Sequence, residues 1–331
     1  PPTRSGKKCE KTHKKEKMMK IGIDIGGMSI KFGLVDEENQ ITAKTVIPTE
    51  LDIPYQKLVG KMADAVKQLL EEQHLTLEDC DGIGIGCPGT INDETGVVIY
   101  SNNIRWENIP LVEELGKHLP VHIAIANDAD AAALGEVCAG AAKGAKAAVL
   151  LTLGTGVGGG VILDRKIFHG PLVGGCELGH ISIDYKGVRC SCGRRGCLEA
   201  YASASALLRI AGEKAMEHPE SVMHGMCDGN LSNMNGKIPF DAAAQGDVAG
   251  RETVEEYESY LACGIANVIN IFRPEKVILG GGVAAQKENL TAPLQELVKD
   301  LCFGGELGGI AQIVTSELGN DAGIIGAANL V

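Results

Sequence analysis

The sequence has no long apolar run and no excess of positive charge. None of its hydrophobic stretches reaches the roughly 20 residues of a membrane-spanning helix, and the Ala-rich stretch near Ala131 is interrupted by charges. The formal net charge of the 331 residues is −12, which argues against nucleic acid or an anionic membrane surface as the main partner. We therefore expect neither a nucleic-acid-binding protein nor a membrane protein.

A secretory leader is also missing, although the chain contains eleven cysteines. Disulfides are rare in compartments that keep thiols reduced, so these cysteines are expected to be free or bound to metal. We expect a cytoplasmic protein. Residues 1–19 are mostly basic and lack an apolar period, and we exclude them from the fold as a disordered or vector-derived tail.

Three cysteines crowd together in the second half of the chain. Cys190, Cys192 and Cys197 are joined by glycine-containing turns that let their sulfurs converge, and His180 precedes them. Three thiolates and one imidazole make a closed tetrahedral zinc set, with no position left for a reactive water. The pattern predicts a structural Zn²⁺ held by these four residues.

Two carboxylates flank the predicted metal site. Glu177 comes just before His180, and Glu199 comes just after Cys197. Carboxylates held in fixed relative positions suit the hydroxyls of a polyol; the alternatives are a small zinc module for nucleic acid or a chance cluster. The pattern Glu-x-Gly-His, then Cys-x-Cys-Gly-x-x-Gly-Cys-x-Glu, resembles the signature of the ROK family of sugar kinases and sugar-responsive repressors.

A glycine pair near the start of the chain predicts a phosphate-binding turn. Two β-rich runs flank Gly26 and Gly27, which indicates a hairpin, and Asp24 ends the first run. Their bare amides and the Asp24 carboxylate would face a phosphate and its metal, although no Gly-Lys-Ser/Thr of a Walker loop follows. The turn resembles the Asp-x-Gly-Gly-Thr phosphate loop of the sugar kinase, Hsp70 and actin superfamily, with Met28 in place of the threonine.

A second glycine cluster formally matches a dinucleotide-binding fingerprint at Gly154, Gly156 and Gly159. An NAD-dependent oxidoreductase is therefore a second function class. The fingerprint requires a helix immediately afterwards, whereas the segment 160–168 is β-rich. Two strand–turn–strand units half a chain apart predict a duplicated fold with nucleotide phosphates clamped between the copies, and Thr155 and Gly156 as phosphate contacts.

The segment 120–140 carries the expected chemistry. A strand runs into Asn127 and Asp128, and an Ala-rich helix follows. Either residue could cap the helix, but capping needs only one, and Asp130 adds a third polar group where ligands bind in open α/β sheets. The family resemblance makes Asp128 the general base and Asn127 a sugar contact.

The same resemblance assigns further ligand contacts. Glu177, His180 and Glu199 would hold ring hydroxyls, and Gly89 would form a wall of the sugar pocket. Asn103 matches an asparagine that precedes a tryptophan in the glucose-phosphorylating branch, although turn formation explains it equally well. Gly281 and Gly282, between a strand and a helix, would line the adenine and ribose site.

The remaining periodicities complete the expected architecture. They predict helices over 56–73 and 203–216, a surface loop over 217–237, a long helix within 241–271, and a C-terminal helix that packs back on the first lobe. The resemblance implies an α/β fold with two lobes, the actin-like (ribonuclease H-like) ATPase fold. We expect a small lobe of residues 20–126 plus 318–331 and a large lobe of residues 127–317 with the zinc motif.

The resemblance implies ATP-dependent phosphorylation of a hexose, with D-glucose 6-phosphate as the first expected product. Kinases for N-acetylmannosamine, N-acetylglucosamine, allose and fructose share these motifs, and polyphosphate could replace ATP. A sugar-responsive repressor would carry a helix-turn-helix domain, for which the short basic tail leaves no room. Mg²⁺ would accompany ATP near Asp24, a homodimer is the family expectation, and the glycine clusters are expected to lie far from the zinc motif.

Overall fold

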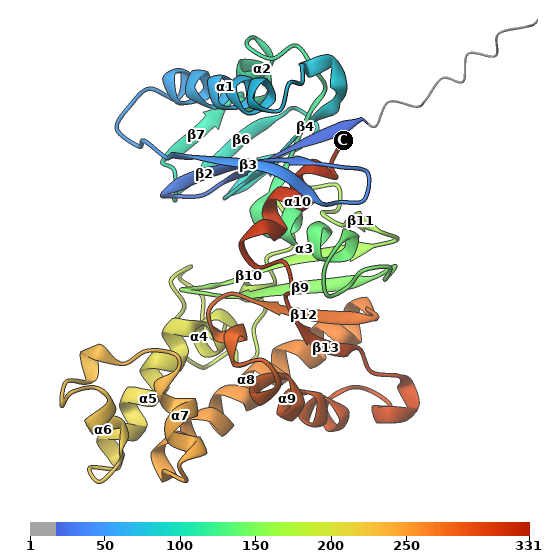
Figure 1. Cartoon of the computed structure of the whole chain (residues 1–331). Coiled ribbons are helices and arrows are strands. Elements are labelled where there is room, and N and C mark those ends of the chain that lie inside the picture. The colour runs from blue at the N-terminus through green and yellow to red at the C-terminus, as the bar shows by residue number, and fades with distance from the viewer. Residues whose placement is uncertain (1–17) are drawn as a thin grey trace, which may run out of the picture.

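The computed structural model describes residues 18–331, which form two lobes stacked one above the other (Figure 1). Residues 1–17, and with them most of the expected tail, lie outside the described residues. The first lobe is built on a five-stranded sheet with the strand order β3-β2-β1-β4-β8. Its strands are β1 (Met19–Ile25), β2 (Ser29–Val35), β3 (Ile41–Pro48), β4 (Cys80–Cys87) and β8 (Ile123–Asn127).

The second lobe repeats this arrangement with the strand order β11-β10-β9-β12-β13. Its strands are β9 (Ala148–Leu153), β10 (Val157–Leu163), β11 (Lys166–Ile167), β12 (Lys276–Gly280) and β13 (Gln312–Thr315). In each sheet the first strand is antiparallel to its hairpin partner and parallel to the strand on its other side. The duplicated fold predicted from the two glycine turns is confirmed. A strand, not the helix of a dinucleotide fingerprint, follows the second turn.

Two helices and a small sheet cover the outer face of the first sheet (Figure 1). They are α1 (Tyr55–Glu72), α2 (Leu111–Gly116), β5 (Thr90–Asn92), β6 (Val97–Ser101) and β7 (Trp106–Ile109). Helix α1 buries one apolar face, with Leu58, Met62 and Leu69 each at most 2% exposed, as the spacing of its apolar residues predicts.

Helices α3 (Asp128–Cys138) and α10 (Ala322–Ala328) cross each other between the two sheets (Figure 1). Their small residues allow a very close approach: a Cβ added to Gly326 would lie 1.6 Å from the Ala131 carbonyl oxygen, and one added to Gly135 2.2 Å from that of Ala322. Helix α10 also lies against Gly22 and Gly84 of the first sheet. The C-terminal helix therefore packs on the first lobe. It also contacts α3, so the two segments that run between the lobes meet at this point.

The second sheet is covered on its far face mainly by helices (Figure 1). They are α4 (Glu199–Ala202), α5 (Ala204–Glu217), α6 (Met223–Met226), α7 (Ile238–Ala244), α8 (Val248–Phe272) and α9 (Glu288–Leu301). Short 3₁₀ turns complete the described chain: η1 (Leu77–Asp79), η2 (Leu178–His180), η3 (Leu231–Asn233), η4 (Val283–Gln286), η5 (Gly305–Gly308) and η6 (Gly319–Asp321). Within residues 18–331, none of the helices has the length and apolarity needed to cross a bilayer.

The long helix expected within 241–271 is confirmed as α8, whose Tyr257, Leu261 and Ile265 are fully buried. It begins only at Val248, because Gly246 adopts a φ of 83° and Asp247 Oδ1 caps the helix by accepting the Gly250 N–H at 2.8 Å. One expectation about this lobe is wrong. The segment 217–237 is not a plain surface loop, because Met223 and Cys227 are fully buried in a small core of their own. The few apolar residues of that segment suffice to anchor it against α5 and α7.

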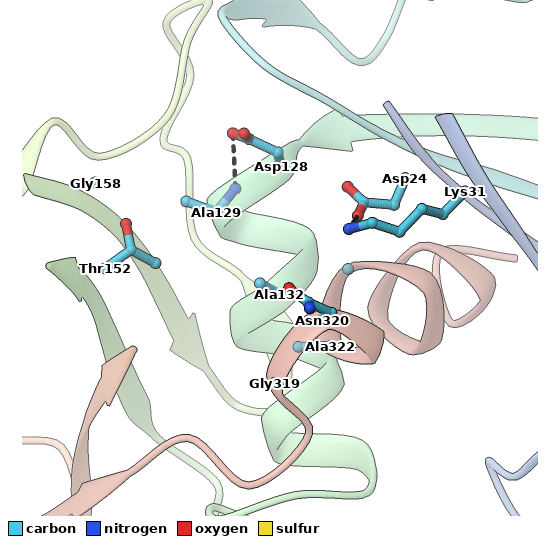
Figure 2. A pocket seen from close by; sticks show the side chains of 11 residues that line it. Asp24, Lys31, Asp128, Ala129, Ala132, Thr152, Gly158, Gly319, Asn320 and Ala322 are labelled. Atoms are coloured by element: carbon cyan, nitrogen blue, oxygen red, sulfur yellow. Dashed lines mark hydrogen bonds and ion pairs between the residues drawn. The ribbon is translucent and has the colours of Figure 1, made fainter. Parts of the chain in front are cut away.

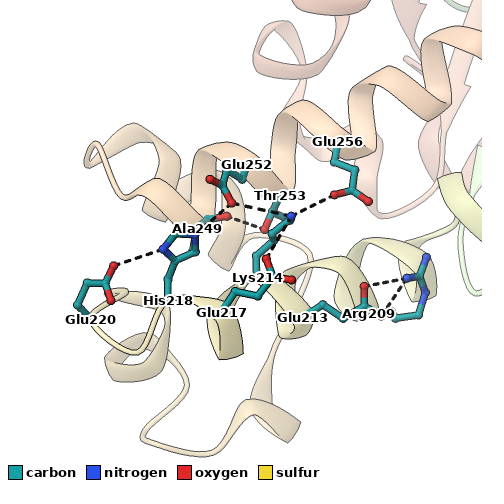
Figure 3. Close-up of polar contacts among 10 residues, drawn as sticks. All are labelled: Arg209, Glu213, Lys214, Glu217, His218, Glu220, Ala249, Glu252, Thr253 and Glu256. Atoms are coloured by element: carbon teal, nitrogen blue, oxygen red, sulfur yellow. Dashed lines mark hydrogen bonds and ion pairs between the residues drawn. The ribbon is translucent and has the colours of Figure 1, made fainter.

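A network of charged side chains joins α5 to α8 on the surface (Figure 3). Lys214 Nζ lies 3.4 Å from Glu217 and 3.5 Å from Glu256, and His218 Nε2 lies 3.1 Å from Glu252. The hydrogen bond that His218 donates to Glu252 is the main cause that raises the pKa of His218. Because these groups are in contact with solvent at the surface, the network adds little to stability.

Candidate active site

Asn127 caps helix α3, which leaves the neighbouring Asp128 side chain available for another role. Asn127 caps the helix: its Oδ1 accepts the Ala129 N–H at 2.8 Å and the Asp130 N–H at 3.4 Å, and its Nδ2 donates to the Gly89 carbonyl at 3.0 Å. Asp128 Oδ1 also accepts from Ala129, at 2.9 Å. Since Asn127 already satisfies the first turn, Asp128 is not needed as the cap.

The Asp128 carboxylate faces a cavity of about 370 Å³ between the lobes (Figure 2). Asp24 and Lys31 enter it from the β1–β2 hairpin, Thr152 from β9, and Asn320 from η6. Asp24 and Lys31 are opposite each other in the hairpin register, and Lys31 Nζ lies 2.9 Å from Asp24 Oδ2. The structure thus brings together Asp24 and Asp128, which the sequence analysis placed at the reaction centre.

Three polar residues of this cavity are absent from the sequence-based prediction: Lys31, Thr152 and Asn320. Lys31 could have been found, because a tight turn after Asp24 places a basic residue on the facing strand of the same hairpin. Asn320 gave no local signal, because only the return of the C-terminal segment between the lobes places it there.

The surroundings of Asp128 favour its neutral form. Burial is the main cause that raises the pKa of Asp128, and the negative charges of Asp24 and Glu177 act in the same direction. The N–H of Ala129 opposes them by stabilising the charged form. A carboxylate of raised pKa takes up a proton more readily than a solvated one, which is what a general base requires.

Asp130, in the same first turn of α3, is more deeply buried. Only 2% of its surface is exposed, and its Oδ1 has no hydrogen-bond partner within the described part of the chain. Burial and the charge of Asp128 raise the pKa of Asp130 to about 7.

Thr49 stabilises the first glycine turn, Gly26 and Gly27, through a side-chain hydrogen bond. The Gly26 N–H donates to Ser29 O at 2.9 Å, and the Thr49 hydroxyl donates to Gly26 O at 2.7 Å. The Met28 side chain is 89% exposed and therefore makes no packing contact of consequence. A Cβ on Gly27 would lie 3.4 Å from the backbone oxygen of Asn103, so this turn adjoins the expected sugar contact.

The second glycine turn lies against the zinc motif. Glu199 Oε2 accepts the Val157 N–H at 3.2 Å and would lie 2.3 Å from a Cβ on Gly156. The expectation that the glycine clusters lie far from the zinc motif is therefore wrong for this turn. Thr155 and Gly156 do not line the cavity of Asp24 and Asp128; Thr152 and Gly158, in the flanking strands, take those places.

Gly282 borders a separate cavity of about 350 Å³, and Gly281 directly precedes Gly282 in the chain. Gly281 has a φ of 83°, and a Cβ there would lie 2.5 Å from the Leu153 carbonyl oxygen. The Gly281 position therefore requires glycine and adjoins the second glycine turn. Ala204 and Lys237 complete the rim, and the Ala204 N–H donates to Gly154 O at 2.8 Å.

The four predicted metal ligands converge. One ligand atom each from His180, Cys190, Cys192 and Cys197 lies within 4.8 Å of the others. Cys192 Sγ is 3.6 Å from Cys197 Sγ, and Cys190 Sγ is 3.8 Å from His180 Nδ1. Ligands of a tetrahedral zinc at the usual bond lengths are separated by about 3.3–3.8 Å, so this donor set fits the ion.

Residues 20–331 match the sequence model of the ROK family. The chain belongs to the ROK family. Within the family it is similar to the glucokinase of Halalkalibacterium halodurans, with 37% identity over 94% of each chain. The glucokinase of Thermotoga maritima is 37% identical over 95% of this chain and 98% of its own.

The solved structures give the same result for the fold. A ROK family glucokinase from Streptomyces griseus, in complex with glucose and AMPPNP, superposes with a TM-score of 0.76 at 34% identity. The match covers 95% of this ROK chain and 99% of the other. The predicted two-lobed, actin-like α/β fold is thereby confirmed.

Proposed function

We propose that this ROK protein is an ATP-dependent hexose kinase that phosphorylates the 6-hydroxyl of D-glucose. The observation that carries the proposal is the carboxylate of Asp128, whose pKa is raised, in one cavity with Asp24 and Lys31. The similarity to two glucokinases, and to a third bound to glucose and AMPPNP, supports glucose and ATP as the substrates.

The residues match what phosphoryl transfer demands. The protein has little covalent work to do; it must align the hydroxyl and neutralise charge on the phosphates. Asp128 accepts the proton of the 6-hydroxyl as that oxygen attacks the γ-phosphoryl group. Asp24 is the carboxylate that would face a Mg²⁺ bound with ATP, and that ion would neutralise phosphate charge.

We assign the sugar contacts to residues beside Asp128 and to the zinc motif. Asn127 is held by both its helix cap and Gly89, so its side chain needs no reorganisation to meet a ring hydroxyl. Glu177 is close enough for its charge to raise the pKa of Asp128. We assign Gly89, Asn103, Asn127, Glu177, His180 and Glu199 to the sugar.

The nucleotide extends over two cavities. The adenosine lies against Gly281 and Gly282, and the triphosphate runs past the turn of Thr155 and Gly156 towards Asp24 and the amides of Gly26 and Gly27. Two observations support this path: Ala204, on the rim of the second cavity, donates its N–H to Gly154 O, and Thr152 and Gly158, in the strands that flank this turn, line the first cavity.

A structural zinc on His180, Cys190, Cys192 and Cys197 holds the sugar-binding carboxylates. Its four positions are filled by protein, so it supplies rigidity and no activated water. Glu199 Oε1 accepts the Ser191 hydroxyl at 3.1 Å, which ties the carboxylate to the cysteine turn itself.

An assay of ADP release with a panel of sugars tests the proposal. Glucose, N-acetylmannosamine, N-acetylglucosamine, allose and fructose are compared with ATP and with polyphosphate as donor, and NAD is added in a parallel arm. We expect the highest kcat/KM with glucose and ATP and no effect of NAD. Wild-type protein that releases no ADP with any hexose would contradict the proposal. Light scattering tests the homodimer that we also propose, at twice the 34.7 kDa chain mass.

A further inference from the structure

Glu136, in the last turn of α3, is a fully buried carboxylate with four hydrogen-bond donors. Its exposed fraction is 0%. Oε1 accepts the Ser316 hydroxyl at 2.5 Å and the Leu318 N–H at 3.0 Å. Oε2 accepts the Ala141 N–H at 2.8 Å and the Glu317 N–H at 3.2 Å.

This donor set selects a carboxylate. Both oxygens act only as acceptors, which an ionised carboxylate does and an amide cannot, because the NH₂ group of glutamine is a donor. Three of the four donors are backbone N–H groups, whose positions depend on the path of the chain. Glu136 therefore fixes mainly backbone.

Three of those donors belong to the segment 316–318, where the chain leaves β13 in the second lobe and approaches α10. The next two residues, Gly319 and Asn320, line the cavity that contains Asp24 and Asp128. Helix α3 lines the same cavity through Asp128, Ala129 and Ala132. Glu136 thus joins two chain segments that both line the proposed phosphate site.

We propose that Glu136 is a positioning residue for the nucleotide: it holds the Gly319–Asn320 wall against α3, so that the phosphates and Asp128 stay aligned. The inference rests on the proposed kinase function. Glu136 lies behind the cavity and touches no substrate. The sugar contacts are placed by Asn127 and the zinc motif, so they do not depend on it.

The substitution Glu136→Gln tests the proposal, because it keeps the size of the side chain and turns one acceptor into a donor. We expect the KM for ATP to rise about tenfold and kcat to fall, since small misplacements at a reaction centre are costly. The dissociation constant for glucose, measured by calorimetric titration without nucleotide, should stay within about twofold.

Glu258→Gln is the matched control, because Glu258 is a buried glutamate of α8 in the second lobe, away from the cavity. It controls for a general loss of stability and should leave the KM for ATP unchanged well below its unfolding temperature. A Glu136→Gln variant with the wild-type KM for ATP would overturn the proposal, as would an equal rise in the glucose dissociation constant.

Ser316→Ala decides the matter if Glu136→Gln does not fold, because it removes one of the four donors. We expect a rise of about two- to threefold in the KM for ATP; no rise overturns the proposal. Failure of the kinase function itself would look different, since the wild type would then turn over no hexose. In that case calorimetric titration with the ATP analogue AMPPNP replaces KM, and equal affinities of wild type and variants overturn the proposal.

Discussion

Lys31 Nζ lies 2.9 Å from Oδ2 of Asp24, on the two strands that meet at the first glycine turn. The Lys31 side chain keeps 34% of its surface exposed, towards the cavity, whereas that of Asp24 keeps 17%. A triphosphate that enters this cavity meets the negative charges of Asp24 and Asp128. Lys31 is the residue that offsets them, and it can pass from Asp24 to a phosphate oxygen by a small rotation.

Lys31→Met should therefore weaken the use of ATP. We expect the KM for ATP to rise about tenfold, which corresponds to about 1.4 kcal/mol, with little change in glucose affinity. Lys61→Met is the control, because Lys61 forms an exposed pair with Glu50 on the outside of the first lobe. Steady-state kinetics at low ionic strength, where electrostatic effects are largest, measure both variants. Equal KM values for ATP in the two variants would contradict this prediction.

Asp128→Asn should abolish most turnover without unfolding the helix. Loss of a positioned general base lowers kcat by about 10²–10⁴, while Asn127 still caps α3. Far-ultraviolet circular dichroism should match the wild type, and the unfolding temperature should not fall below it. If the variant keeps near-normal turnover, Asp128 is a structural residue only.

The carboxylate of Asp128 should also determine how turnover falls at acidic pH. Turnover needs Asp128 without its proton, and burial raises the pKa of this group above its ordinary value of 3.8. Turnover should rise with pH through a midpoint above that value, and a conservative change of Asp24 to Asn should move the midpoint down by removing a neighbouring charge. A midpoint at the ordinary carboxyl value would contradict the assigned environment.

The raised pKa of Asp130 predicts that the free energy of unfolding falls as pH rises. Its folded pKa of about 7 lies above the ordinary value of 3.8, so between these values the native state holds a proton that the unfolded chain has lost. Stability therefore falls as pH rises through this window. We expect Asp130→Asn to remove the cost, so that its gain in unfolding free energy over the wild type grows by about 2 kcal/mol between pH 5.5 and pH 8.

Denaturant unfolding at the two pH values measures this difference. Asp64→Asn, on the exposed side of α1, is the control and should show no such trend. Parallel pH curves for wild type and Asp130→Asn would show that Asp130 is not held protonated in the fold.

Local sequence signals predicted much of this fold because the signals and the contacts are close in the chain. The two glycine hairpins, the strand before Asn127 and the cysteine turns all close over short distances, and all four metal ligands meet as expected. The start of α8 also has a local signal, since Gly246 followed by Asp247 is a helix stop followed by a cap.

Contacts between distant segments could not be predicted in the same way. Asn320 enters the phosphate cavity because α10 returns between the sheets, and Glu199 reaches Val157 because the zinc motif folds onto the second glycine turn. Each contact depends on how whole elements pack. The sequence showed Glu136 only as one polar residue in an Ala-rich helix, and its four donors appear only in the folded structure.

The contact between Glu199 and the second glycine turn changes what loss of zinc should do. If the metal only fixed the sugar contacts, Cys192→Ser would weaken glucose binding and leave ATP unaffected. Because Glu199 also accepts the Val157 N–H beside Gly156, we expect Cys192→Ser to weaken both substrates, glucose more strongly. Stability should fall too, since metal-binding free energy is part of the folding free energy of such a segment.

Elemental analysis, thermal unfolding and separate affinities for glucose and AMPPNP measure these effects, with Cys263→Ser as a control thiol outside the metal cluster. The wild type and the control should carry about one zinc per chain, and Cys192→Ser should carry much less. Glucose binding that weakens while AMPPNP binding stays at the wild-type level would mean that the second glycine turn keeps its shape without Glu199. A zinc-free wild type with full activity would remove the structural role of the metal altogether, and the Glu177–Glu199 registration would then have to come from the backbone turns at Gly193 and Gly196 alone.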